Sequence, residues 1–135
     1  MKYVLDTNAV SAMMRGDAAF LDRLARVGKS DTSIPQPVLA EIAYGIERLP
    51  RSKRRDALEA RFALVRDEVP RAVWTDEVSE RFGTVKALLE KRGARIEDFD
   101  VAIAAHALAA GATLVTANVG HMTRVPGLVV EDWGR

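Results

Sequence analysis

The sequence predicts an α/β protein in which helices cover both faces of a short central parallel sheet, a three-layer α/β/α sandwich. Short apolar segments alternate with helical patterns along the chain, which is the order expected of parallel strands joined by crossover helices. These segments are apolar throughout, as expected for strands that are buried on both faces. The 135 residues contain no repeat, linker or change of composition, so we expect a single domain over residues 1–135.

The first half of the chain predicts two strands and four helices. The strands are expected at 3–5 and 32–34. Apolar residues at helical spacing predict helices that follow Asp6 and end near Gly16, span 18–27, run from Pro37 to about 49, and span about 52–67. Pro37 fits the first turn of its helix, where a missing N–H costs nothing, and Pro50 ends that helix.

The second half continues the same alternation. Strands are expected at 72–74, 113–116 and 128–130. A helix capped by Asp76 is expected to end at Gly93. Another helix, at 99–110 and capped by Asp98, is apolar on nearly every side. We therefore expect it to be deeply buried, with His106 packed in the core.

Composition and charge exclude several classes of protein. The chain is 48% hydrophobic with a net charge of +1, which excludes a disordered chain and is not the balance of a protein that coats DNA. Without cysteine, disulfides and thiolate metal sites are excluded. No apolar run reaches the roughly 18 residues of a membrane span, and Asp6 comes too early for a signal peptide. We therefore expect a cytoplasmic protein without membrane contact.

Three acidic residues fall where the predicted architecture brings ligands together. Asp6 ends the first strand, and Glu41 and Asp100 lie in the opening turns of two helices. Because helices run antiparallel to the strands in right-handed crossovers, these turns lie at the carboxyl edge of the sheet, where open α/β proteins bind ligands. Thr116 and Asn118 leave the fourth strand at the same edge. We therefore expect Asp6, Glu41 and Asp100 to face one another across a pocket.

Three carboxylates in one pocket repel one another, and a divalent cation relieves that repulsion. Oxygen ligands without cysteine favour Mg²⁺ or Mn²⁺ over zinc, and such an ion supports phosphodiester hydrolysis. Taken singly, Asp6 fits a helix cap equally well, and Glu41 fits a solvated charge. Asp98 and Asp100 cannot share a helix face, so we assign the cap to Asp98 and the pocket to Asp100.

Five short motifs follow one another along the chain: YVLDTN at 3–8, LAEIAYG at 39–45, DVAIAAHA at 100–107, LVTAN at 114–118, and RVPGL at 124–128 followed by EDW at 131–133. In this order they resemble the PIN-domain ribonucleases, and among them the VapC-type toxins of toxin–antitoxin pairs. The resemblance covers essentially the whole chain. No single motif is decisive, and the specificity lies in their combination and order.

The resemblance implies a PIN-like α/β/α fold and an endoribonuclease that depends on Mg²⁺ or Mn²⁺, with Asp6, Glu41 and Asp100 as metal ligands. The polar residues that would orient ligands, water or phosphate are Thr7, Asn8, Thr116 and Asn118. The resemblance further implies a homodimer and a small cognate antitoxin that covers the active site, with DNA reached only through the antitoxin. The RNA that is cleaved and the number of metal ions do not follow from it.

One position departs from the family pattern. Where the family commonly has an acid followed by Phe, this chain has His121-Met122. His121 then either takes the place of a fourth carboxylate in the site or is a loop residue outside it. An imidazole there would affect the binding of a second metal, the level of activity and its pH dependence. The alternative function is therefore a catalytically weakened PIN-fold binding module that acts mainly in complex with an antitoxin.

A basic cluster lies between the third and fourth predicted helices. It comprises Arg48, Arg51, Lys53, Arg54 and Arg55. The cluster fits a solvated helix start, a contact with RNA phosphates, or a contact with an acidic stretch of an antitoxin. The sequence leaves these three interpretations open.

Overall fold

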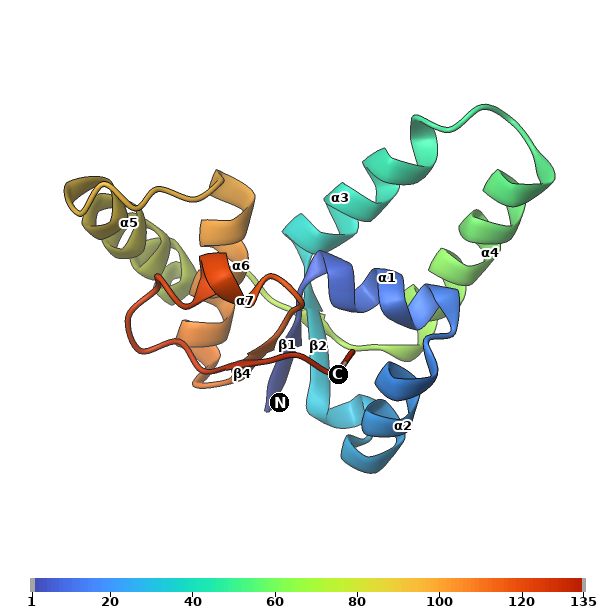
Figure 1. The fold of residues 1–135 in the computed structure, drawn as a ribbon, viewed down its shortest axis with the longest axis horizontal. Helices are drawn as coiled ribbons and strands as arrows, with labels where there is room; N and C mark the ends of the chain where they lie inside the picture. Colours follow the sequence, from blue (N-terminus) through green and yellow to red (C-terminus); the bar gives the residue numbers. More distant parts are fainter. Residues whose placement is uncertain (1, 135) are drawn as a thin grey trace.

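The computed structural model describes residues 2–134, in which five short strands form one sheet (Figure 1). The strands are β1 (Tyr3–Leu5), β2 (Thr32–Pro35), β3 (Arg71–Ala72), β4 (Thr113–Val115) and β5 (Val130–Glu131). Their spatial order is β3-β2-β1-β4-β5, and every neighbouring pair is parallel. The structure confirms the predicted α/β class with a central parallel sheet.

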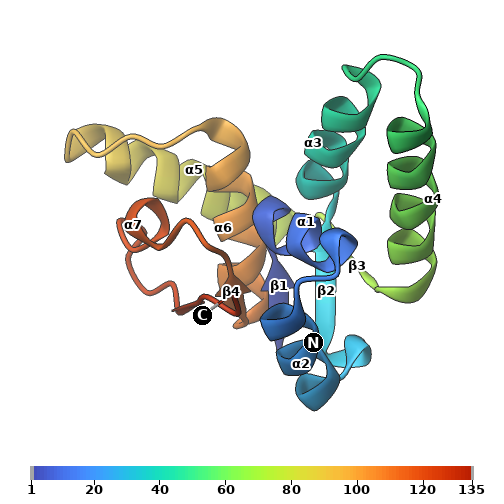
Figure 2. The ribbon, with the colours of Figure 1, turned by 45° about the vertical axis from the view of Figure 1, so that its right-hand side comes forward.

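Helices flank this sheet. They are α1 (Thr7–Arg15), α2 (Ala18–Val27), α3 (Gln36–Glu47), α4 (Lys53–Glu68), α5 (Asp76–Lys91), α6 (Asp98–Ala110) and α7 (Val119–Met122), with a 3-10 turn at Lys29–Asp31. In both ribbon views α1 begins at the upper end of β1, and α3 and α4 form an arm that projects away from the sheet (Figures 1 and 2). Helix α6 packs against β1, β4 and α5. Among the described residues, no helix is both long enough and apolar enough to cross a membrane.

The core lies between the central strands and α6. Leu5 and Leu114 are fully buried in adjacent strands, and every residue from Val101 to Ala107 is buried in α6. The deep burial predicted for this helix is therefore confirmed. His106 is 2% exposed, and burial lowers the pKa of its imidazole, so the ring is neutral in the core.

Both predicted caps in the second half were wrong. Thr75 caps α5, because its hydroxyl accepts a hydrogen bond from the N–H of Val78 at 3.3 Å, and Asp76 is instead the first helical residue. Asp98 is likewise the first residue of α6 and makes no cap bond. Its carboxylate instead forms an ion pair with Lys86 of α5 at 3.1 Å.

Two strands are shorter or later than the sequence predicts. Strand β3 ends at Ala72, and Trp74, which was expected inside it, is 44% exposed and donates its indole N–H to Ser79. Strand β5 begins at Val130, whereas the apolar run predicted 128–130. The apolar run continues past the paired residues of β3 and begins before those of β5, so the composition alone misplaces both strands.

Candidate active site

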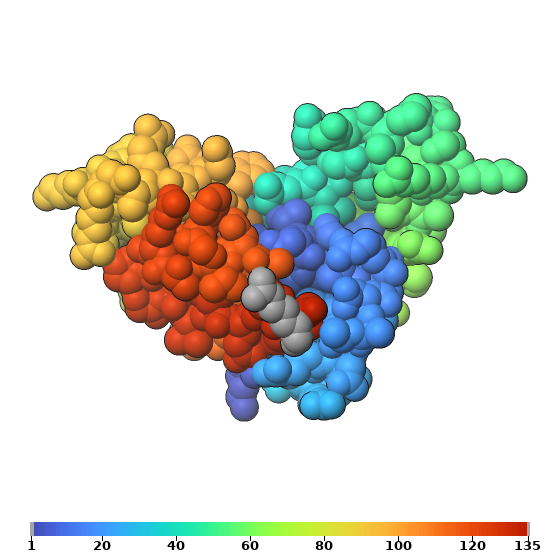
Figure 3. Space-filling view, in the orientation of Figure 1, coloured from blue at the N-terminus to red at the C-terminus, as the bar shows by residue number. Residues whose placement is uncertain are grey.

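The candidate site lies at the carboxyl edge of the sheet, where the order of the strands reverses. Strand β1 pairs with β2 on one side and with β4 on the other, which makes its carboxyl end a switch point of the kind that binds ligands in α/β proteins. A cavity of about 450 Å³ opens there and is lined by Asp6, Glu41, Asp100 and Thr116 among others. Figure 3 shows a notch between the arm of α3 and α4 and the lobe of α5 and α6, with the N-terminal part of the chain at its base.

Asp6 occupies the centre of this site and is 3% exposed. One carboxylate oxygen accepts a bond from the N–H of Thr7 at 2.7 Å, and the other accepts a bond from the hydroxyl of Thr116 at 2.8 Å. Burial raises the pKa of Asp6, while the bonds from Thr116, Thr7 and Asn8 partly offset the shift. All of these donors are neutral, so the negative charge of the carboxylate is held in place without a counter-charge.

Thr116, which directly follows β4, links the polar groups of the site. While its hydroxyl donates to Asp6, it accepts bonds from the side-chain amide of Asn8 at 3.1 Å and from the N–H of Asn118 at 2.9 Å. The side-chain oxygen of Asn8 in turn accepts the N–H of Ala117 at 2.7 Å. The loop after β4 is thereby tied to the start of α1, as the joint location of these residues at the sheet edge predicted.

Glu41 reaches the site from α3. Its carboxylate accepts a bond from the hydroxyl of Thr7 at 2.6 Å, across 34 positions of sequence. Thr7 therefore bridges two of the predicted ligands, because its backbone N–H binds Asp6 and its side chain binds Glu41.

Asp100 lies in the first turn of α6 and is half-buried. Burial, together with the negative charges of Asp6 and Glu41, raises the pKa of its carboxyl to about 6, and the opposing influence of His121 is smaller. The three predicted acids are therefore close enough for the charges of two of them to affect the protonation of the third. Asp98, by contrast, pairs with Lys86 and does not line this cavity.

His121 lies on the short helix α7, which the sequence analysis missed. It is exposed, and its Nδ1 lies 3.2 Å from the side-chain amide nitrogen of Asn118. Because Asn118 is bonded through its backbone to Thr116, His121 is connected to the polar network around Asp6. His121 does not line the acidic cavity, but it lines a neighbouring groove together with Asp100 and Asn118.

The residues fit a hard divalent cation in chemistry, although they do not enclose one. Within residues 2–134, no three acidic or histidine side chains stand close enough together to hold an ion as they are placed. The donor set consists of carboxylate, hydroxyl and amide oxygens, and the mutual repulsion that raises the pKa of Asp100 is what a cation would relieve. Asp6, Glu41 and Asp100 all line the cavity, and their role as metal ligands stays a prediction.

Several lining residues escaped the sequence analysis as parts of a site. They include Arg15 at the end of α1, Asp17 after it, and Asp132 and Trp133 near the end of the chain. Trp133 is 2% exposed and packs against Tyr3 with ring centroids 5.2 Å apart. In the sequence, the apolar residues before Trp133 predict only that the tryptophan packs in the core. Nothing in this local pattern indicates that Asp132 and Trp133 line a pocket formed by distant parts of the chain.

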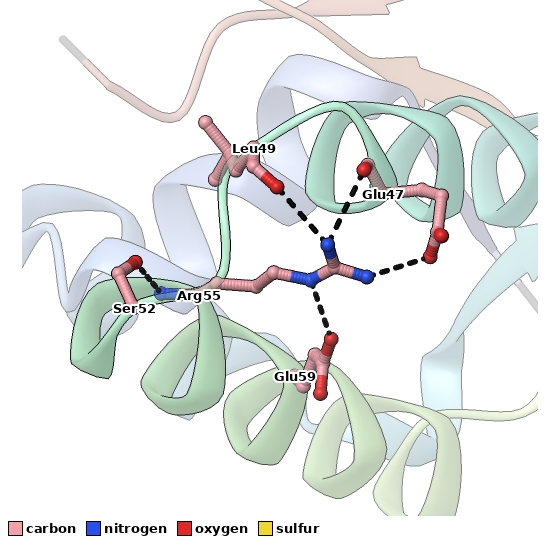
Figure 4. A network of polar contacts seen from close by, with 5 residues as sticks. All are labelled: Glu47, Leu49, Ser52, Arg55 and Glu59. Carbon is pink, nitrogen blue, oxygen red and sulfur yellow. Dashed lines mark hydrogen bonds and ion pairs between the residues drawn. The ribbon is translucent and has the colours of Figure 1, made fainter.

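The basic cluster does not act as a single surface. Arg55 is 8% exposed, and its guanidinium donates to the carboxylates of Glu47 at 2.8 Å and Glu59 at 2.9 Å, and to the carbonyl of Leu49 at 3.0 Å (Figure 4). This residue therefore joins α3 to α4 and is not free to contact RNA. Its four companions, Arg48, Arg51, Lys53 and Arg54, are exposed.

Comparison with known proteins identifies the family. A family model described as the PIN domain matches residues 3–128. The chain belongs to the PIN-domain family. This PIN-domain protein is 31% identical over 137 residues to Ribonuclease VapC2 of Rickettsia felis, with both chains covered completely. It is 28% identical to the tRNA(fMet)-specific endonuclease VapC of Salmonella typhimurium, over 98% of each chain.

Solved structures of VapC-containing complexes share the same fold. The PIN-domain chain matches a structure of VapBC2 from Rickettsia felis bound to a promoter DNA fragment, with a TM-score of 0.88, 28% identity and coverage of 98% of this chain and 99% of that chain. It matches DNA-bound VapBC from Salmonella typhimurium with a TM-score of 0.80, 27% identity and 98% coverage of both chains. These matches confirm the predicted resemblance to VapC-type proteins and the predicted class of enzyme, a ribonuclease.

Proposed function

We propose that this chain is the toxin of a toxin–antitoxin pair and hydrolyses RNA phosphodiester bonds with one or more divalent cations, Mg²⁺ or Mn²⁺, held by Asp6, Glu41 and Asp100. The observation that carries the proposal is the cavity at the carboxyl edge of the sheet, which Asp6, Glu41 and Asp100 line together. The raised pKa of Asp100, caused by burial and by the charges of Asp6 and Glu41, supports it. Three carboxylates therefore act on one space, which is the electrostatic condition that favours a bound cation. When bound, such a cation activates water and neutralises charge on a phosphoryl group.

The polar residues of the site position these carboxylates. Thr116 and Thr7 each donate to a ligand oxygen, so the carboxylates of Asp6 and Glu41 are oriented before any cation arrives. Mutation of groups that orient ligands in this way typically lowers metal affinity or activity by about 10- to 100-fold. Asn8 and Asn118 hold Thr116 from the other side, which keeps its hydroxyl directed at Asp6.

The proposed partners are RNA, a small antitoxin and a second copy of this chain. The VapBC complexes among the structural neighbours support an antitoxin, and two of them are bound to DNA. A net charge of +1 supports contact with DNA only through such an antitoxin. Trp74 and Phe99 are 44% and 46% exposed beside an apolar groove between α3 and α6, and exposed apolar surface of this kind supports a homodimer.

The test uses purified protein, free of antitoxin, and total RNA with Mg²⁺, with Mn²⁺ or with EDTA. We expect discrete fragments that disappear with EDTA. Asp100→Asn should reduce cleavage by at least about 100-fold, because it removes one ligand charge without changing the size of the side chain. Asp76→Asn is the matched control, since Asp76 also lies in the first turn of a helix but is exposed and outside the acidic cavity.

Either of two results would contradict the proposal. A folded wild-type protein that cleaves no RNA with either cation would favour the alternative of a weakened binding module. Equal activity of Asp100→Asn and Asp76→Asn would remove Asp100 from the reaction. Sequencing the fragment ends of an active wild type would identify the RNA substrate.

A further inference from the structure

A second polar groove adjoins the acidic cavity on the side of α7. It has a volume of about 710 Å³ and is lined by Arg95, Glu97, Asp98, Asp100, Asn118 and His121. We call it the α7 groove. Asp100 and Asn118 line both this groove and the acidic cavity, so the two spaces meet at Asp100. A chain-like ligand that reaches the three acids can therefore extend into the α7 groove.

The geometry of His121 makes its imidazole a hydrogen-bond donor into this groove. The side-chain N–H of Asn118 lies 3.2 Å from Nδ1, and when Nδ1 accepts that bond, the proton of the neutral ring is on Nε2. No partner of Nε2 is found among residues 2–134. A histidine that ligates a metal needs the opposite arrangement, with a lone pair on the free nitrogen and an N–H donated to an oxygen.

The orientation of His121 is linked to the acidic site. Asn118 is fixed through its backbone N–H, which donates to the hydroxyl of Thr116 at 2.9 Å. That hydroxyl donates in turn to Asp6 at 2.8 Å. Three hydrogen bonds therefore connect the imidazole to the central carboxylate, and they hold His121 at a defined position beside the acids.

The charges in the α7 groove are arranged so that donors remain available. Arg95 is exposed, and its ion pair with Glu90 is long, at 3.9 Å. Of the acids that line the groove, Asp98 is paired with Lys86, and Glu97 is exposed to water. The third acid, Asp100, lies where the groove meets the acidic cavity and belongs to the proposed cation site. Phosphates next to the cleaved bond keep their negative charge and need N–H donors, which Arg95 and His121 supply.

We propose that the α7 groove binds the RNA strand adjacent to the cleaved bond, with His121 Nε2–H donating to a phosphate oxygen and Arg95 contacting the same strand. This inference rests on the proposed function and specifies how its substrate is held. It makes His121 a substrate-binding residue at a position where the family commonly has an acid. A carboxylate there would repel the phosphate, so this chain differs from an acid-bearing relative in how it holds RNA.

The test measures the affinity of the full chain for a short, fluorescein-labelled, single-stranded RNA in EDTA and low salt, where metal-dependent cleavage is suppressed. A glutamine amide nitrogen can take the place of Nε2, whereas an asparagine amide takes the place of Nδ1. We expect His121→Ala and His121→Asn to weaken binding by about 5- to 10-fold, as the loss of a hydrogen bond to a charged group predicts. His121→Gln should stay within about 2-fold of the wild type.

Arginine variants provide a second arm of the test. Arg95→Ala should weaken RNA binding, whereas Arg92→Ala, a change in an exposed arginine outside the groove, should not. Equal melting temperatures of all variants would show that each chain is folded. Mn²⁺ affinity, measured by calorimetry, should be the same for His121→Ala and the wild type.

The outcomes separate this inference from the proposed function. If the wild type cleaves RNA with Mn²⁺ but His121→Ala binds RNA as tightly as the wild type, the inference falls and the nuclease stands. If RNA binding depends on His121 but no cation supports cleavage, the inference stands and the proposed nuclease falls. A loss of Mn²⁺ affinity in His121→Ala with unchanged RNA affinity would assign the imidazole to the metal and overturn the inference.

Discussion

Asp6 and Arg55 are two buried charges in the same small chain, with 3% and 8% of their surfaces exposed. Arg55 donates to two carboxylates and to backbone carbonyls where α3 meets α4 (Figure 4). Asp6 receives hydrogen bonds from Thr7, Thr116 and Asn8, all of them neutral. The positive charge of Arg55 is therefore paired with negative charges, whereas the negative charge of Asp6 has only neutral hydrogen-bond donors around it.

The pKa shifts of these two groups show what the difference means. The hydrogen bond to Glu59 is the largest cause of a raised pKa at Arg55, which means that the fold stabilises its positive charge. Burial is the largest cause of a raised pKa at Asp6, which means that the fold disfavours its negative charge. Both pKa values are raised, but for opposite reasons. At Arg55 the charged form is stabilised by ion pairs within the fold, whereas at Asp6 the charged form is buried without a positive partner among the described residues. Groups of the second kind are concentrated at functional sites.

Among the changes that probe this comparison, removing the hydroxyl that orients Asp6 is expected to have the largest effect. Thr116→Val keeps the shape of the side chain but removes the donor to Asp6 and the acceptor for Asn8 and Asn118. We expect RNA cleavage to fall by about 10- to 100-fold. Thr123→Val is the matched control, since the hydroxyl of Thr123 is exposed and bonds only to the carbonyl of Gly120. A Thr116→Val enzyme as active as Thr123→Val would mean that the network has no part in the reaction.

Arg55→Met sharpens the comparison from the structural side. The change keeps an unbranched apolar stem but leaves the carbonyls of Glu47 and Leu49 without their donor. We expect the melting temperature to fall by several degrees while divalent-cation affinity is unchanged, because Arg55 lies in the arm and not in the acidic cavity. Arg54→Met, at the exposed neighbouring residue, should leave the melting temperature unchanged. A loss of cation affinity in Arg55→Met with an unaltered melting temperature would contradict this account, because it would give Arg55 a role in the site and none in stability.

The smallest effect concerns the pH dependence of stability. The pKa of Asp100 is about 6 in the folded chain against 3.8 for an ordinary aspartate, so the folded state binds the proton more tightly. The resulting stability is present at low pH and is lost as the pH rises from about 4 through about 6. Without added cation, lowering the pH from about 7.5 to about 5 should stabilise the wild type relative to Asp100→Asn by about 1 kcal/mol, after allowance for solvent screening.

Denaturant unfolding of both proteins at the two pH values measures this difference. The lowered pKa of His106 acts in the opposite direction, but both proteins contain this residue and its contribution cancels. A difference between the wild type and Asp100→Asn that does not change with pH would show that Asp100 is ionised as easily as an exposed aspartate.

Much of the fold follows from local pattern. The apolar segments after Lys2 and before Thr116 predict β1 and β4 because strands buried on both faces have no polar side, and Gly16 and Gly111 end their helices in the left-handed conformation that glycine favours. The caps of α5 and α6 were not predictable in the same way. Several neighbouring residues there are able to cap, and the choice depends on tertiary partners such as Lys86.

The acids of the site were predictable, but their environment was not. The position of Asp6 after β1 and of Asp100 in the first turn of α6 follows from the topology of a parallel sheet. The bridge from Thr7 to Glu41 and the participation of Trp133 in the cavity wall depend on contacts between residues far apart in sequence. The α7 helix is too short for periodicity to reveal, so the link from Asn118 to His121 required the structure.

The central claim is that Asp6, Glu41 and Asp100 leave a negative charge that a divalent cation neutralises. Thermal unfolding of the wild type, Asp100→Asn and Asp98→Asn, with Mn²⁺ and with EDTA, tests it directly and requires no knowledge of the RNA. We expect Mn²⁺ to raise the melting temperature of the wild type and of Asp98→Asn, with a much smaller rise for Asp100→Asn. An equal response of all three proteins, or no response of the wild type, would contradict the account.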